Sequence, residues 1–359
     1  MLFCNNPSCH NPLHCFLPPY IIDRLVESGD AEIRRLGTEA LASDAAARAV
    51  RSTLAMMPMM AAIPSPSGNK NRLVYDMKND APFPIVLPGK LIRSEGEQPV
   101  VGDEAVNEAY DHAGITYDFY KDVLGRNSLN DQGMSLISSV HYGRRYNNAF
   151  WDGKQMAYGD GDGRLFIGFT KALDVVAHEL THGVVSFTSN LKYNKEPGAL
   201  NEHFADAFGA MVKQWHLKED VNAANWLNGE TIMGSVTTAK SIRTFKEGKA
   251  YENDPMLGTD PQPKHMRDKY TGTDDSGGVH INSGIPNHAF YKVAMEIGGN
   301  SWDKTGKIWY QTLKNLGRGS KFQEAASMTH MVAGSMFGAG SLEQKAVKNG
   351  WSAVGITVI

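Results

Sequence analysis

The chain has 359 residues, of which 42% are hydrophobic and 21% charged, and its formal charge is -3 at pH 7. This length favours two domains plus an appendage, and the balanced charge excludes the basic excess typical of nucleic-acid-binding proteins. No run of 18 apolar residues occurs, and the N-terminus lacks the pattern of a Sec signal peptide. We therefore expect no membrane span and synthesis in the cytoplasm, with any secretion by a non-Sec route.

Residues 1–72 form a distinct N-terminal segment. All three cysteines lie within its first fifteen residues, so a disulfide framework is excluded for the rest of the chain. Pro18 and Pro19 impose an extended backbone. Residues 21–54 show the apolar spacing of helices, whereas residues 56–71 are rich in Met, Pro, Ser and Asn. The latter composition predicts a linker that is open to proteolysis.

The remaining chain changes character near residue 160. Before it, strands are predicted at residues 73–77, 136–142 and 148–158, with one helix at 104–124. After it, helices are predicted over residues 172–187, 201–218, 280–297, 304–314, 322–336 and 342–347. This order predicts an α+β protein with a β-rich domain at 73–187, a mostly helical domain at 188–359, and a cleft at their junction.

The helix predicted at residues 172–187 carries the motif H-E-x-x-H, with His178, Glu179 and His182. Four residues make about one turn, so both imidazoles point from one face toward one place. Two imidazoles are half of a zinc site, and catalytic zinc takes a third protein ligand and leaves a fourth position to water. Glu179 is placed to accept that water's proton. Because the motif arises by chance in on the order of a few per cent of comparable chains, other residues must decide.

Two later segments supply such residues. Glu202 and Asp206 share one face of the next predicted helix, where Glu202 can complete the zinc site and Asp206 can hold a ligand imidazole. His280 follows a Gly-rich turn, with Asp275 five residues before it. His280, oriented by Asp275, and Tyr193 are candidate donors to the oxyanion of peptide hydrolysis. The alternatives are exposed acids and a structural histidine at a helix start.

The chain from about residue 73 to 359 resembles the thermolysin-like zinc endopeptidases in the order and spacing of segments 147–151, 158–163, 174–183, 198–206 and 270–284. The resemblance implies a two-domain zincin fold with one catalytic zinc at the domain junction. It implies zinc ligation by His178, His182 and Glu202, with Asp206 behind a ligand. It also implies Glu179 as general base, with oxyanion stabilisation by Tyr193, His280 and Asp275.

The same resemblance implies a substrate cleft. Asn148 and the backbone of Ala149 match groups that hold the substrate main chain, and Arg243 matches an arginine near a primed-side carbonyl, with looser alignment. The apolar pocket after the scissile bond is implied to be lined by Phe166, Phe169 and Val175. We therefore expect a neutral, monomeric endopeptidase that cleaves proteins and peptides on the N-terminal side of bulky hydrophobic residues.

The segment from Phe16 to Tyr20 narrows the resemblance to the protealysin-like subgroup, whose short propeptide carries a Pro-Pro-aliphatic element. Tyr20 departs from that pattern. The resemblance implies that residues 1–72 are a propeptide and linker, and we expect this segment to inhibit the enzyme in cis through Cys15, Pro18, Pro19 and Tyr20. A thiolate binds zinc strongly, so Cys15 is a candidate for the fourth zinc position. The alternatives are steric blocking, free thiols, or a separate zinc site of Cys4, Cys9, His10, His14 and Cys15.

The paired calcium site of the family is expected to be absent. Its helix position is Lys213, two further positions are Asn225 and Leu227, and only Asp174 and Glu230 keep a carboxylate. Calcium takes six to eight oxygen ligands, so we expect the ammonium of Lys213 to replace the ion by pairing with both acids. A solvated surface lysine is the simpler alternative.

Two other functions compete with the endopeptidase. A catalytically silent, peptide-binding zinc protein of the same fold would be expected to have lost a catalytic residue, and none of those named above is substituted. An aminopeptidase would need an acidic site for the free amine of its substrate, and the sequence shows no motif for one. Zinc content and cleavage of an end-blocked, internally quenched peptide distinguish the three.

Overall fold

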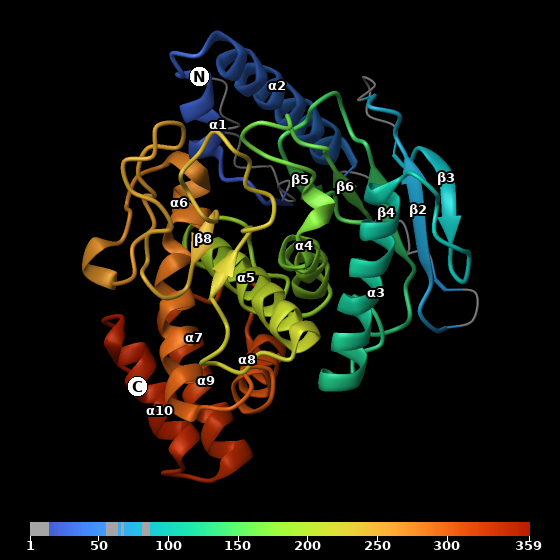
Figure 1. The fold of residues 1–359 in the computed structure, drawn as a ribbon. Helices are drawn as coiled ribbons and strands as arrows, with labels where there is room; N and C mark the ends of the chain where they lie inside the picture. Colours follow the sequence, from blue (N-terminus) through green and yellow to red (C-terminus); the bar gives the residue numbers. More distant parts are fainter. Residues whose placement is uncertain (1–13, 55–63, 66–67, 81–86) are drawn as a thin grey trace.

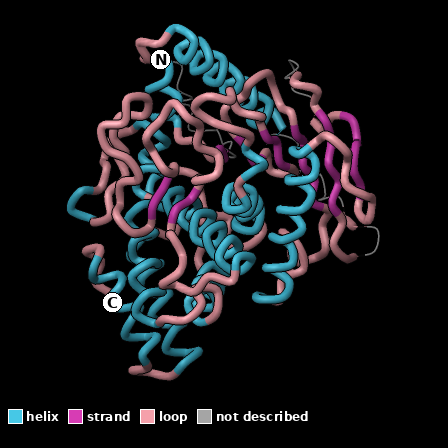
Figure 2. Tube along the Cα trace, in the orientation of Figure 1, coloured by secondary structure: helices cyan, strands magenta, loops and turns pink. Residues whose placement is uncertain are grey.

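The computed structural model describes residues 14–54, 64–65, 68–80 and 87–359 (Figure 1). Most strands gather on one side of the molecule, while the C-terminal part of the chain is helical (Figure 2). Within the described ranges, no helix is both long and apolar enough to cross a bilayer. The predictions made for Cys4, Cys9 and His10 lie outside these ranges.

One mixed sheet contains six strands in the order β1-β5-β6-β4-β2-β3. The strands are β1 (His14–Cys15), β2 (Arg72–Asp76), β3 (Lys90–Ser94), β4 (Leu136–Val140), β5 (Ala149–Trp151) and β6 (Met156–Tyr158). The pairs β2–β4 and β4–β6 are parallel, and the other three pairs are antiparallel. The sheet therefore begins with a strand from the N-terminal segment, which the sequence did not predict.

The strand predicted at residues 148–158 is a hairpin of β5 and β6. Between them, the amide of Asp152 donates to the carbonyl of Gln155 at 3.1 Å. The Asp152 carboxylate also accepts from the amides of Lys154 and Gln155, at 2.7 and 2.9 Å. A side chain that binds its own backbone two residues on favours a turn, and this turn ends the strand.

Three helices form the centre of the molecule: α3 (Glu104–Leu124), α4 (Leu173–Ser186) and α5 (Lys195–Leu217). The bounds predicted for α3 are confirmed, with Asp103 capping its start and Gly125 in the left-handed conformation after its end. Helix α5 begins at Lys195 rather than at residue 201, and Gly198 lies in its first turn. A Cβ at Gly198 would lie 2.4 Å from Val279, so glycine is required there by close packing.

The C-terminal part contains α6 (Asp274–Asn282), α7 (Gly284–Ile297), α8 (Lys304–Asn315), α9 (Phe322–Phe337) and α10 (Leu342–Ala353). The helix predicted at 280–297 is divided at Ser283, and α10 continues past its predicted end. Two short strands, β7 (Leu227–Asn228) and β8 (Arg243–Thr244), pair antiparallel beside α5. Short 3-10 turns occur at η1 (Phe169–Lys171) and η2 (Met266–Asp268).

The N-terminal segment folds as two helices, α1 (Pro19–Val26) and α2 (Ala31–Leu54), at the end of the molecule opposite α8 to α10 (Figure 1). Pro18 is extended as predicted, but Pro19 is the first helical residue, where its missing N–H costs nothing. The two helices meet closely at Gly37, where a Cβ would lie 2.7 Å from the backbone of α1. Helix α1 buries Ile21, Ile22 and Leu25.

Candidate active site

The two histidines of α4 and Glu202 of α5 meet in the fully buried centre of the molecule. One ligand atom from each of His178, His182 and Glu202 lies within 4.8 Å of the others, and no other such group occurs among the described residues. The Nε2 atoms of the histidines are 3.1 Å apart. The nearest carboxylate oxygens of Glu202 lie 3.5 Å from His178 Nε2 and 3.4 Å from His182 Nε2.

The hydrogen bonds behind the histidines fix which nitrogens carry protons. His178 Nδ1–H donates to the Asp206 carboxylate at 2.9 Å, and His182 Nδ1–H donates to the side-chain oxygen Oδ1 of Asn201 at 2.8 Å. The amide group of Asn201 donates to the Leu191 carbonyl, which orients its oxygen toward His182. Each Nε2 atom therefore carries a free lone pair, and both Nε2 atoms lie close to each other and to the Glu202 carboxylate. Ligands about 2.0–2.1 Å from a tetrahedral zinc lie roughly 3.3 Å apart, so the donor set fits the ion.

Charge and burial favour the same protonation states. Burial lowers the pKa of His182 to about 3, which keeps the imidazole neutral and able to ligate. Burial alone raises the pKa of Asp206, but the nearby Arg243 and His178 outweigh it and hold the pKa below its usual value. Asn287 donates to Asp206 at 2.8 Å. Asp206 is thus an ionised acceptor, as expected of a residue that orients a metal ligand.

Glu179 is fully buried on α4 beside the metal group. Burial, together with the negative charge of Glu179, raises the pKa of the Tyr158 hydroxyl on β6. The role of Glu179 as a base remains a prediction, and its position directly after His178 is compatible with that role.

The predicted oxyanion donors are brought together. The Tyr193 hydroxyl lies 3.0 Å from His280 Nε2 and donates to Glu202. His280 Nδ1 lies 2.5 Å from the Asp275 carboxylate. Burial lowers the pKa of His280, but the charges of Asp275 and Glu202 outweigh it and raise the pKa above its usual value. His280 can therefore carry protons on both nitrogens and donate through Nε2.

An extended stretch of the N-terminal segment, from His14 to Leu17, contacts the residues of this site. Strand β1 pairs antiparallel with β5, the Phe16 amide donates to Ala149 O at 3.1 Å, and the Leu17 amide donates to Asn148 Oδ1 at 2.9 Å. Arg243 Nη2 donates to the Phe16 carbonyl at 2.7 Å. The three residues predicted to hold a substrate main chain thus all hold the chain's own N-terminal segment.

The prediction that Cys15 fills the fourth zinc position is wrong for this structure. The Cys15 side chain packs in an apolar cluster with Tyr142, Tyr146 and Phe150, outside the group of ligand atoms. It is the Cys15 carbonyl that faces the site, 3.1 Å from His280 Nε2. Because side chains alternate along a strand, turning Phe16 toward the metal group turns Cys15 away from it.

Phe16 is a site residue that the sequence interpretation missed. Its fully buried ring lies 5.2 Å from the His178 ring and 4.6 Å from Arg243 Cζ. A Cβ at Gly229 would lie 3.0 Å from the Phe16 ring, so this glycine makes room for it. The sequence signal that could have identified Phe16 as a site residue was a bulky apolar side chain directly before Leu17 and Pro18. The pocket residues expected from the sequence are buried in the same core cluster as Phe16: Phe166, Phe169 and Val175.

Tyr20 and the prolines follow this strand. The Tyr20 side chain packs against the main core, and burial followed by the charge of Asp260 raises the pKa of its hydroxyl well above the usual value. Pro18 and Pro19 connect the strand to α1 without contributing an N–H to either. Their inhibitory role remains a prediction.

The predicted pairing of Lys213 with both acids is confirmed for Asp174 and is wrong for Glu230. Its ammonium is 2.7 Å from Asp174 and also donates to the Leu227 carbonyl. Glu230 is paired with the side chain of Asn225, at 2.6 Å, instead of with Lys213. The lysine therefore neutralises one acid, and an amide satisfies the other.

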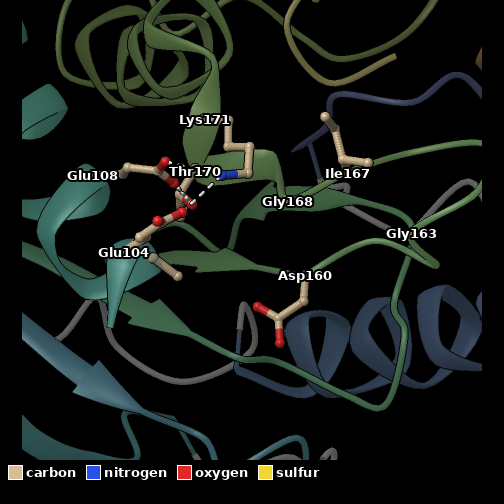
Figure 3. A pocket seen from close by; sticks show the side chains of 9 residues that line it. Glu104, Glu108, Asp160, Gly163, Ile167, Gly168, Thr170 and Lys171 are labelled. Atoms are coloured by element: carbon tan, nitrogen blue, oxygen red, sulfur yellow. Dashed lines mark hydrogen bonds and ion pairs between the residues drawn. The ribbon is translucent and has the colours of Figure 1, made fainter. Parts of the chain in front are cut away.

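A shallow pocket lies away from the metal group, between α3 and η1 (Figure 3). Lys171 bridges Glu104 and Glu108 at 3.2 and 3.3 Å, and Thr170 donates to Glu108 at 2.7 Å. These polar groups satisfy one another, and none of the predicted catalytic residues lines the pocket.

Comparison with known proteins agrees with this geometry. The family models for the thermolysin metallopeptidase catalytic domain and alpha-helical domain match residues 67–186 and 189–356. An extracellular metalloprotease of Pectobacterium carotovorum subsp. carotovorum is 42% identical over 355 residues, 97% of each chain. Protease PrtS of Photorhabdus sp. (strain Az29) is 48% identical over 297 residues, 81% of this chain and 78% of that protein. The solved precursor of protealysin from Serratia proteamaculans has a TM-score of 0.84 and 41% identity, covering 96% of this chain and 100% of that chain.

The chain therefore belongs to the thermolysin metallopeptidase family and is a zinc metalloendopeptidase. Its likeness to the protealysin precursor extends over nearly the whole chain, so within the family it is of the protealysin type.

Proposed function

We propose that this endopeptidase cleaves on the N-terminal side of bulky hydrophobic residues and is made as a precursor silenced by its own N-terminal segment. One observation carries the proposal: an extended segment is held by Arg243 through the Phe16 carbonyl, with the ring of Phe16 beside the metal-group residue His178. That segment occupies the place of a substrate. A bulky apolar side chain is therefore what the pocket accepts.

The proposed mechanism assigns each step to a group of the site. Zinc, when bound to His178, His182 and Glu202, would polarise the peptide carbonyl and lower the pKa of water. Glu179 takes a proton from the attacking water and passes it to the leaving nitrogen. Tyr193 and His280 donate to the carbonyl oxygen as it gains negative charge.

Substrate positioning is proposed to use the contacts that now hold the N-terminal segment. Ala149 O and Asn148 Oδ1 accept main-chain amides, and Arg243 donates to the carbonyl of the residue after the scissile bond. Arg243 is fully buried, and its charge is shared between Glu202 and Asp206 at 3.8 and 3.6 Å. It is therefore held in place before a substrate arrives.

The division of the chain into residues 1–72, 73–187 and 188–359 is part of the same proposal. On this division, the first part is removed and the zinc site is built where the other two meet. N-terminal sequencing of the matured enzyme tests the first boundary, because the mature chain should begin between α2 and β2.

Glu179→Gln tests the mechanism. The amide cannot accept a proton, so hydrolysis of an end-blocked, internally quenched peptide should fall by about 10²–10⁴-fold while bound zinc, measured by elemental analysis, is unchanged. Glu252→Gln, an exposed glutamate paired with Lys249, is the matched control and should retain full activity. Unchanged turnover in the Glu179 variant would remove this residue from the mechanism. A wild-type enzyme that required a free N-terminus would instead be an aminopeptidase.

A further inference from the structure

The N-terminal strand places two consecutive carbonyls on two different groups of the site. The Cys15 carbonyl lies 3.1 Å from His280 Nε2, and the Phe16 carbonyl accepts from Arg243 at 2.7 Å. His280 Nε2 is itself 3.0 Å from the Tyr193 hydroxyl and 3.6 Å from Glu202 Oε1. The Cys15 carbonyl thus lies at the oxyanion donors beside the metal ligands, and the Phe16 carbonyl lies one residue farther on.

The amides and side chains follow the same register. The nitrogen of the Cys15–Phe16 bond donates to Ala149 O, and the next amide donates to Asn148. The Phe16 ring lies beside His178 and against Gly229. The strand therefore has the direction and register of a substrate whose scissile bond joins Cys15 to Phe16, with a bulky hydrophobic residue after that bond.

We propose that the precursor hydrolyses its own Cys15–Phe16 bond. This inference rests on the proposed function and identifies a substrate for it. Water adds to the Cys15 carbonyl carbon, the bond to the Phe16 nitrogen breaks, and Cys15 becomes the C-terminal carboxylate of the released peptide. The Phe16 nitrogen leaves as an amine, with its added proton delivered by Glu179. The reaction consumes one water and needs no other reactant.

This cut does not by itself open the cleft. Phe16, Leu17, Ile21 and Leu25 are all buried in the main core, so the chain after the cut remains packed on the catalytic part. Glu32 also pairs with Arg145 at 2.6 Å. The nicked precursor thus keeps an inhibitory segment on the primed side, and activation needs a second cut after α2. Maturation therefore has two steps, of which the first occurs within one molecule.

The test follows the N-termini of the full-length, zinc-loaded precursor by intact-mass spectrometry. A chain beginning at Phe16 should appear before the mature chain, with a first-order rate that does not change over a tenfold range of protein concentration. The Glu179→Gln precursor should stay uncut. Phe16→Gly should slow the cut at least tenfold, whereas Leu41→Ala, at an exposed position on α2, should not change its rate.

A second measurement needs neither zinc nor turnover. In the metal-free Glu179→Gln precursor, hydrogen exchange of the Phe16 and Leu17 amides should be slowed at least a hundredfold relative to an unstructured peptide. Free exchange there would overturn the register. A wild-type precursor that never yields a chain starting at Phe16, although the mature enzyme cleaves a blocked peptide, would overturn this inference alone. A first-order rate constant for this cut that rises in proportion to protein concentration would also overturn the inference. A mature enzyme that does not cleave the blocked peptide would overturn the proposed function as well.

Discussion

Lys213 allows a quantitative test of how this chain stabilises the region where the family's calcium site is expected to be absent. Its side chain is 16% exposed and lies 2.7 Å from Asp174, which is 3% exposed. Asp174 is in the first turn of α4, the helix that carries His178. Lys213→Met keeps an unbranched side chain one atom shorter and removes the charge, which leaves the Asp174 carboxylate buried without its cation.

The expected loss follows from this geometry. Removing one partner of a buried ion pair costs about 3–5 kcal/mol, because the remaining charge is uncompensated. Lys213 is partly accessible, and the Gly229 amide still donates to Asp174 at 3.3 Å, so the lower end applies. We expect a loss of about 3 kcal/mol in the free energy of unfolding, which is a roughly 150-fold change in the folding equilibrium.

The assay is urea unfolding of the precursor, followed by circular dichroism, in the Glu179→Gln background to prevent self-digestion. Lys240→Met removes an exposed lysine and is the matched control, for which we expect a change within about 0.5 kcal/mol. If the Lys213 and Lys240 variants lost the same free energy, the ion pair would not have the stabilising role assigned to it.

The same position tests the calcium prediction. Lys213→Glu places a third carboxylate near Asp174 and Glu230, so the stability of this variant should depend on calcium. The natural chain should show no such dependence, because Lys213 already neutralises Asp174. A wild-type unfolding free energy that rises with micromolar calcium, together with two bound calcium ions per chain, would refute the reasoning.

Three further predictions concern single side chains. Hydrogen bonding to Asp160 raises the pKa of His141 to about 9. Protonated His141 therefore contributes on the order of 2 kcal/mol to the free energy of unfolding. This contribution is fully present below about pH 6.5 and is lost as the pH rises through 9. His141→Gln should therefore reduce the fall in unfolding free energy between pH 6 and 9.5. An unchanged slope would exclude His141 as a source of that pH dependence. Phe16→Ala should weaken the hold of the N-terminal segment by about 3 kcal/mol and remove the lag before blocked-peptide hydrolysis, and a preserved lag would contradict the pocket's role. Cys15→Ser should leave the spectrum of the cobalt-substituted precursor unchanged, whereas loss of a sulfur-to-cobalt band would show that the Cys15 thiolate binds the metal.

The sequence was most informative where one helix carries the chemistry. The spacing of His178 and His182 requires only helical geometry, and the charge pattern of α5 placed Glu202 and Asp206 on one face. By contrast, the partner of His182 is Asn201, whose amide is selected by tertiary packing and has no spacing rule relative to the motif.

The N-terminal strand shows why other predictions failed. Two residues of β1 are too short for a period to be seen, and their pairing with β5 joins parts of the chain more than 130 residues apart. Without that pairing, the sequence could not show which side chain of the segment faces the site. The prediction therefore chose the chemically reactive Cys15, whereas register selects Phe16.

The position of β5 directly inside the edge strand β1 has a consequence for the proteins that the mature enzyme is expected to cleave. On the proposed function, removal of β1 makes β5 the edge of the sheet, and a substrate would be held there chiefly through main-chain hydrogen bonds, by strand addition. A substrate must therefore present several residues in extended conformation, with main-chain amides and carbonyls that are not already hydrogen-bonded. A helix uses those groups internally, so intact helices should resist digestion, and loops, tails and partly unfolded chains should be cut first.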